Sequence, residues 1–198
     1  NFTVVGVDKA AWELRYDEAS RALQLRRKGA WSYDEDFAGF KWVEGVSGRW
    51  ADNSRWDLGR VPASAKNYAR FLGTSSYDGY DLSQQIAADL ESQNWEIQLL
   101  DLSESINLLI QNGGLTVNDN DTGSQSIKIR PGTTLKFDDV RLTQKKQTVK
   151  FEFLEGANET LELANTTLIA AKGGWCIQTD KYGGDQANSL VYVHDGSY

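Results

Sequence analysis

Apolar and polar residues alternate with a period of two along much of this chain. The alternation is regular in residues 12–16 and 22–26, which flank the polar stretch Asp-Glu-Ala-Ser at residues 17–20. Successive side chains of a β-strand point to opposite faces, so this period predicts strands. Two such runs joined by a short polar turn predict a hairpin. We therefore expect an N-terminal β-hairpin.

Short groups of alternating apolar residues recur from Leu99 onward. Turns rich in Asn, Gly, Asp or Thr bound them, as at residues 111–114 and 130–133. The groups are Ile106/Leu108/Ile110, Leu115/Val117, Ile127/Ile129, Leu135/Phe137, Val140/Leu142, Val149/Phe151/Phe153 and Leu161/Leu163. A spacing of about 8–12 residues is typical of β-sandwiches and of small β-helix coils. The pattern predicts an all-β fold, either a short β-solenoid or a jelly-roll-like sandwich.

Two short stretches carry helix signals. In residues 83–93, apolar side chains recur at helical spacing behind a serine that is a suitable N-cap. Residues 63–68 form a second candidate, as a short turn. Each stretch is equally compatible with a loop, so we expect at most one or two short helices.

The chain has no Ser/Pro-rich or charged linker that would mark a domain boundary. Its length of 198 residues is sufficient for a single core. Five of its seven tryptophans lie within the first 56 residues. We therefore expect one β domain over residues 1–198, with a Trp-rich hairpin end at residues 1–62 and a strand-pair core at residues 63–198.

The charge balance argues against some partners. The chain has 28 Asp and Glu residues against 21 Lys and Arg residues, a formal net charge of −7, and no basic block. Binding to a nucleic-acid backbone depends on clustered cations, so no nucleic-acid partner is expected. No apolar run approaches the roughly 20 residues that span a bilayer, so no transmembrane segment is expected either.

Histidine and cysteine each occur once, as His194 and Cys176. The usual zinc sites need several such ligands, and a catalytic thiol needs a nearby base. Cys176 lies between Trp175 and Ile177 and is interpreted as a small buried hydrophobic residue. We expect no metal and no cofactor.

The most distinctive segment is residues 48–62, Gly-Arg-Trp-Ala-Asp-Asn-Ser-Arg-Trp-Asp-Leu-Gly-Arg-Val-Pro. Trp50 and Trp56 precede a Gly-x-Val-Pro sequence that runs from Gly59 to Pro62. This segment resembles the start of strand-rich repeat units in bacterial autotransporter passenger domains and in surface proteins with a PEP-type sorting tail. The resemblance implies a secreted or cell-surface bacterial protein and favours a coil. It also implies structural roles for Trp50, Trp56, Gly59 and Pro62.

Aromatic residues beside carboxylates suggest a glycan-binding role. Sugars have flat C–H faces surrounded by hydroxyls, so their binding sites pair an exposed aromatic ring with polar acceptors and donors. The candidates are Trp31, Trp42, Tyr77, Asp78, Tyr80 and Asp81. The alternative is that these aromatic side chains fill the core. We expect a non-catalytic domain that contacts an extracellular glycan or a mucin-like glycoprotein.

Asp121 opens an Asp-Thr-Gly tripeptide that resembles the catalytic loop of aspartic peptidases. That mechanism needs two carboxylates that share a proton, so a single copy requires a homodimer. A polar turn explains the same residues without catalysis. An aspartic-type peptidase or other hydrolase acting on glycoproteins is therefore the alternative function. A purely structural surface module is the third.

Overall fold

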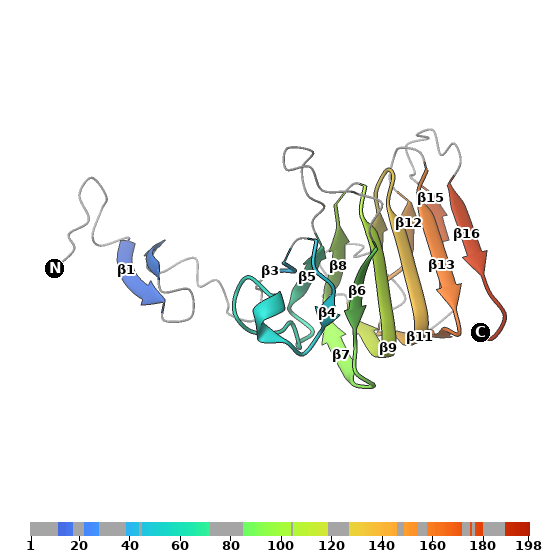
Figure 1. Ribbon diagram of the computed structural model, residues 1–198, viewed down its shortest axis with the longest axis horizontal. Helices are drawn as coiled ribbons and strands as arrows, with labels where there is room; N and C mark the ends of the chain where they lie inside the picture. Colours follow the sequence, from blue (N-terminus) through green and yellow to red (C-terminus); the bar gives the residue numbers. More distant parts are fainter. Residues whose placement is uncertain are drawn as a thin grey trace.

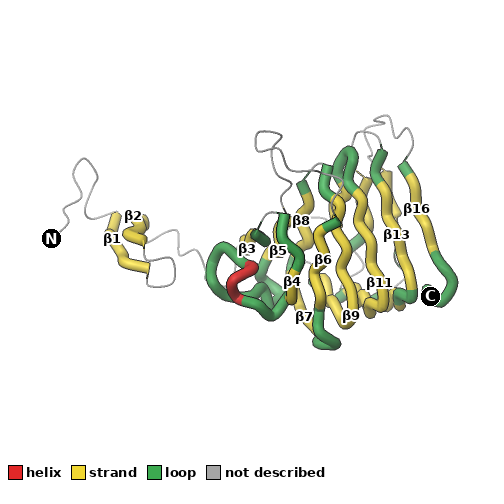
Figure 2. The backbone as a smooth tube through the Cα atoms, in the orientation of Figure 1, coloured by secondary structure: helices red, strands yellow, loops and turns green. Residues whose placement is uncertain are grey.

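The computed structural model describes residues 12–17, 22–27, 39–43, 45–71, 85–103, 105–118, 127–145, 149–153, 158–171, 175, 177–179 and 189–198. Its main body is a β-solenoid of about four turns. The parallel strands stack side by side from β3 to β16 (Figure 1). The predicted all-β class is confirmed, and a solenoid forms rather than a sandwich. The described helical structure is the single 3-10 turn η2 (Asn53–Arg55) (Figure 2).

Two parallel sheets build the coils. The first, called face 1, has the order β15 (Ile177–Thr179), β12 (Phe151–Phe153), β10 (Ile127–Ile129), β8 (Leu99–Leu102), β5 (Tyr68–Phe71) and β3 (Gly39–Lys41). The second has the order β16 (Leu190–Val193), β13 (Thr160–Ala164), β11 (Thr134–Gln144), β9 (Asn107–Val117), β6 (Ile86–Asp89) and β4 (Gly48–Arg49). Two further strands extend it, since β7 (Asn94–Ile97) pairs with β9 and β14 (Thr167–Ile169) pairs with β11.

The second sheet has two parts. The first halves of β9 and β11 pair with β6 and β13 and form face 2. Their second halves pair with β7 and β14 and form face 3. Left-handed residues lie where the faces meet, at Asn112, Asp139 and Asn165, with φ angles of 58°, 54° and 47°. Asn and Asp tolerate this conformation better than other non-glycine residues, so their positions specify the corners.

The core consists of in-register stacks of apolar side chains. Leu108 pairs with Leu135, which pairs with Leu161, and all three are fully buried. The neighbouring stack contains Ile110 and Phe137, which are also fully buried. One coil alone cannot bury its inward side chains, so stacking of successive coils completes the core.

The predicted N-terminal hairpin is confirmed. It consists of β1 (Trp12–Asp17) and β2 (Ala22–Arg27), which pair antiparallel and form their own two-stranded sheet. The register places Asp17 opposite Ala22, so the predicted polar stretch connects the two strands.

The predicted helix over residues 83–93 is wrong where the structure describes it. Residues 86–89 form strand β6, and residues 94–97 form β7. The apolar positions of this stretch also follow a period of two, which is the period of a strand. As the strand period requires, Ala88 and Leu90 lie on one face and are fully buried. The second helix candidate, residues 63–68, contains a turn, in which the Asn67 N–H donates to the Ser64 carbonyl oxygen at 2.9 Å.

The Trp-rich segment closes the first coil. Residues 41–43 pair antiparallel with residues 55–57, through an isolated Trp42–Trp56 bridge. The Val43 N–H donates to Arg55 O at 2.8 Å, and the Asp57 N–H donates to Lys41 O at 2.9 Å. Residues 39–62 therefore pack with the strand-pair core, and the solenoid begins at β3.

Candidate functional site

Most of the site residues chosen from the sequence lie outside the described residues. These are Trp31, Tyr77, Asp78, Tyr80, Asp81 and Asp121, together with Cys176. Their predicted roles, including the catalytic role of Asp121 in a peptidase, therefore stay predictions.

The prediction that Trp42 is an exposed platform for sugar is wrong. Its side chain is only 2% exposed. The indole stacks on Phe71 with ring centroids 5.3 Å apart and meets Trp56 edge-on at 4.9 Å. Its Nε1 donates to the carbonyl oxygen of Val46 at 2.6 Å. Both ring faces therefore belong to the core and cannot contact a ligand.

The four positions expected to be structural lie around this core. Trp50 and Trp56 are buried, with ring centroids 4.9 Å apart. The Nε1 atom of Trp56 donates to the backbone oxygen of Trp50 at 2.9 Å, and that of Trp50 donates to the oxygen of Pro62 at 3.2 Å. Gly59 has a φ of 64°, which glycine adopts without steric cost. The motif thus packs internally and presents no aromatic face to a ligand.

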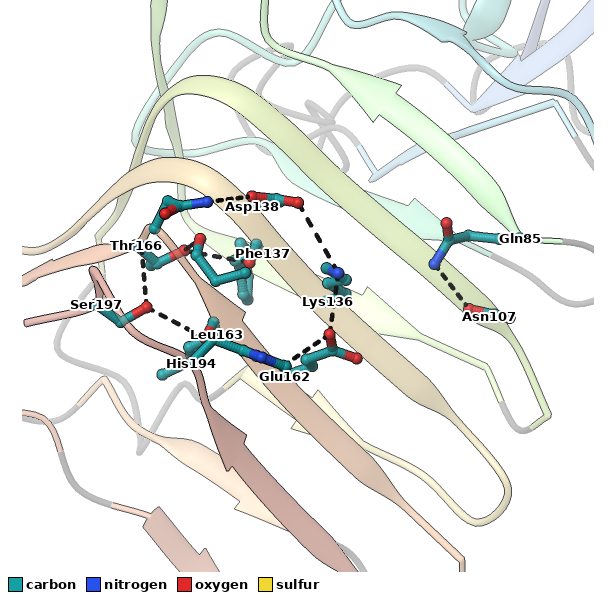
Figure 3. Close-up of polar contacts among 12 residues, drawn as sticks. Gln85, Asn107, Lys136, Phe137, Asp138, Glu162, Leu163, Thr166, His194 and Ser197 are labelled. Atoms are coloured by element: carbon teal, nitrogen blue, oxygen red, sulfur yellow. Dashed lines mark hydrogen bonds and ion pairs between the residues drawn. The ribbon is translucent and has the colours of Figure 1, made fainter.

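A different polar surface lies on the outer side of face 2 (Figure 3). Glu162 is at its centre, because its Oε1 lies 2.9 Å from Lys136 Nζ and 2.9 Å from His194 Nε2. Lys136 Nζ also lies 3.8 Å from Asp138 Oδ2. We call Lys136, Asp138, Glu162, Tyr192 and His194 the Glu162 surface.

The strand register assembles this surface. Lys136 on β11 pairs with Glu162 on β13, which pairs with Tyr192 on β16. Adjacent strands are about 4.8 Å apart, so the three side chains form one row across the sheet. Their neighbours in the strands, such as Leu135 and Leu161, point into the core and fix the backbone that presents the row.

Opposite charges on the Glu162 surface form ion pairs that order its side chains. The hydrogen bond to Glu162 raises the pKa of Lys136, against the opposing effect of burial, and the negative charges of Glu162 and Asp138 add to this increase. Lys136 is therefore a permanent cation at neutral pH. Both contacts to Glu162 use Oε1, and Oε2 has no hydrogen-bond partner among the residues that the structure describes. That oxygen is available to accept a bond from a ligand.

Tyr192 supplies an aromatic ring to the same surface. It is 49% exposed and lies in register with Glu162. Tyr192 was not among the residues predicted from the sequence, because the groups of alternating apolar residues ended at Leu163. The run of apolar residues, mostly β-branched and aromatic, at positions 190–193 was the available signal for a strand. Its position beside Glu162 depends on the register between coils, which a local pattern does not contain.

A second polar pair lies farther along the same face. Gln85 Nε2 donates to Asn107 Oδ1 at 3.4 Å (Figure 3). Amide groups both donate and accept, so this pair extends the polar character of face 2 beyond the Glu162 surface.

Comparisons with protein-family models, with curated proteins and with solved structures found no match for this chain. In the described ranges, no group of three or more His, Cys, Asp or Glu side chains is arranged to hold a metal ion. Within the same ranges there is no helix with the length and apolar character needed to cross a membrane.

Proposed function

We propose that this protein is a secreted or cell-surface β-solenoid that binds an extracellular glycan, such as the glycan of a mucin-like glycoprotein, without catalysis. The Glu162 surface is the proposed binding site. The observation that supports this most directly is the exposed ring of Tyr192 in register with the hydrogen-bonded carboxylate of Glu162. The resemblance of residues 48–62 to repeat units of bacterial surface proteins supports the extracellular location.

The proposed binding mode uses each group according to its chemistry. The C–H face of a sugar ring stacks on Tyr192, as apolar faces do on aromatic rings. Sugar hydroxyls donate to Glu162 Oε2 and accept from the ammonium group of Lys136. The ion pairs already order these side chains, so less conformational entropy is lost on binding.

The test is a titration of neutral and mucin-type glycans against the wild type and two tyrosine variants. Tyr192→Ala should weaken binding at least about tenfold, a loss of about 1.4 kcal/mol. Tyr198→Ala is the matched control, because Tyr198 is also exposed, at 83%, but lies outside the Glu162 surface. It should bind like the wild type.

Three results would contradict the proposal. Equal losses in both tyrosine variants would mean that the Glu162 surface is not the site. Retention of full affinity by Tyr192→Ala would mean the same. A wild type that binds no glycan or glycoprotein would favour the purely structural module. Circular dichroism of each variant separates a lost contact from a lost fold.

A further inference from the structure

Face 1 gathers cations on its outer side. Strand register aligns one outward residue from each successive coil into a row parallel to the solenoid axis. The row contains Lys41, Arg70, Asp101, Lys128 and Glu152. The residues on either side of each in its strand, such as Phe40, Ala69 and Leu100, are buried, so the charged side chains point outward.

Asp101 forms ion pairs with two arginines, Arg70 on this row and Arg130 beside it. Its Oδ2 lies 3.0 Å from Nη2 of Arg70 and accepts from Nε of the same residue at 3.0 Å. Its Oδ1 accepts from Nη2 of Arg130 at 3.2 Å, and Arg130 Nε donates to the carbonyl oxygen of Leu102 at 2.6 Å. One carboxylate thus holds two guanidinium groups, both partly exposed, and the cluster keeps a net positive charge.

Two lysines extend the positive charge along the row. Lys41 is exposed and Lys128 is half-buried, and neither ammonium group forms an ion pair with another described residue. Lys41 lies on one side of Arg70 in the register, and Lys128 lies next to Asp101. The row therefore presents cations over several successive coils.

The net charge of face 1 has the opposite sign to the net charge of the whole chain. Its described outward and flanking side chains include five cations, Lys41, Arg70, Lys128, Arg130 and Lys150, and two carboxylates, Asp101 and Glu152. The adjacent loop adds one charge of each sign, from Asp57 and Arg60. The net charge of the full chain is −7. The fold therefore concentrates positive charge on one face of an acidic protein.

We propose that the outer side of face 1 binds an acidic polysaccharide, a linear polymer whose carboxylate or sulfate groups alternate with sugar hydroxyls. The row from Lys41 to Glu152 crosses four strand-to-strand steps, or about 19 Å, and can follow an extended chain. Charge complementarity selects the anionic groups, which pair with the arginines and lysines. This surface is separate from the Glu162 surface, and its ligand is charged.

The carboxylate of Glu152 on the row favours a polysaccharide over a nucleic acid. Duplex DNA carries about one negative charge per 1.7 Å of its axis. The carboxylate of Glu152, which ends the row, would face this dense charge and repel it. In a polysaccharide the anionic groups are separated by hydroxyls, and hydroxyls donate hydrogen bonds to carboxylates.

The experiment measures binding of heparin, polygalacturonate, dextran and duplex DNA by titration calorimetry. Heparin carries sulfate, polygalacturonate carries carboxylate, and dextran is the neutral control. The wild type should bind at least one of the two acidic polysaccharides at least about tenfold more tightly than dextran. Its affinity should fall at least about tenfold between roughly 0.05 and 0.5 M salt, because the contacts are exposed charges.

Charge reversal locates the site. The double variant Lys41→Glu/Lys128→Glu should lose at least about tenfold in affinity for the acidic polysaccharide. The matched control is Arg141→Glu/Lys145→Glu, which makes the same charge change on two exposed cations of face 3. It should lose less than about threefold, the effect of net charge alone. Tyr192→Ala should leave this binding unchanged, which separates the proposal from the neutral-glycan function.

Four results would overturn the proposal. They are no binding to either acidic polysaccharide, equal binding to dextran, equal losses in the two double variants, and binding to duplex DNA as tight as to the polysaccharide. The last result would assign the face to nucleic acid. Unchanged far-UV circular dichroism and a cooperative urea transition in both double variants confirm that the fold is intact.

Discussion

The two ends of the solenoid differ in how far their inward-facing side chains are buried. At the end formed by β3 and β4, Trp42, Trp50 and Trp56 are at most 2% exposed. At the opposite end, β16 continues the core stacks, yet Val191 is 41% exposed and Val193 is 63% exposed (Figure 1). Among the described residues, no strand pairs with the free edge of β16.

This difference shows that a neighbouring layer, more than the strand pattern, determines burial in a solenoid. Val191 pairs with Leu161, and Val193 pairs with Leu163, so all four belong to the inward-facing stacks. Leu161 and Leu163 are buried because coils flank them on both sides. The first coil has such a layer because residues 55–57 fold back over residues 41–43. The indoles fill the space that a preceding coil would occupy.

Removal of an indole from the capped end should have the largest effect. Trp56 meets Trp42 and Trp50 at 4.9 Å and lies 5.9 Å from Phe71. Trp56→Ala leaves a large cavity and removes the hydrogen bond to Trp50 O, so unfolding free energy should fall by about 3–5 kcal/mol. Urea denaturation measures this. A loss below about 1 kcal/mol would contradict the structural role of the cap.

Truncation in the middle of the stack should be the next largest effect. Leu161 is fully buried between Leu135 and Val191. Leu161→Ala should lower the free energy of unfolding by about 2–5 kcal/mol, the usual range for a buried leucine. The measurement is again urea denaturation. A cost equal to that of truncating the exposed Val191 would contradict the dependence of burial on stacking.

Acidification should weaken a corner next to the capped end. Burial opposes ionisation of Asp89, but hydrogen bonds from the Glu91 N–H and the Asn112 amide hold its pKa below the ordinary value. A lowered pKa means that this stabilisation is complete above the unfolded pKa of about 3.8 and is lost as pH falls through the folded pKa.

Asp89→Asn tests this contribution. The variant should be less stable than the wild type at pH 6 by about 1–2 kcal/mol, because its amide cannot accept these bonds as a carboxylate does. As the pH falls through the lowered folded pKa of Asp89, the gap should shrink, because the wild-type carboxyl becomes protonated. Urea denaturation at pH 6 and over a series of acidic pH values measures the gap. A gap that is constant or grows on acidification would show that Asp89 does not stabilise the corner through its charge.

Truncation at the open end should have the smallest effect. Val191→Ala removes two methyl groups from a side chain that is already 41% exposed. We expect a loss of less than about 1 kcal/mol, below that of Leu161→Ala in the same stack. Urea denaturation of the two variants in parallel is the measurement. A larger cost at Val191 would show that the open end contributes to the core as a covered coil does.

The sequence by itself determined the local structure. Alternation with a period of two specifies strands, so the hairpin at residues 12–27 and the strand groups after Leu99 were predictable. In residues 83–93 the apolar positions fit both a helical period and a period of two. Strand β6 shows that the period of two applies there. Asn, Asp and Gly at the turns were likewise visible, because their tolerance of left-handed backbone is a local property.

Only the tertiary structure decided which surfaces the strands form. Lys41, Arg70 and Lys128 are far apart in the sequence, where no basic block exists, and become one row only through parallel register. Tyr192 lies in register beside Glu162 for the same reason. Register depends on how many residues each coil and its turns contain, and these numbers vary along the chain. A periodic pattern gives the face of each residue within its strand, whereas contacts between strands arise only when the coils stack.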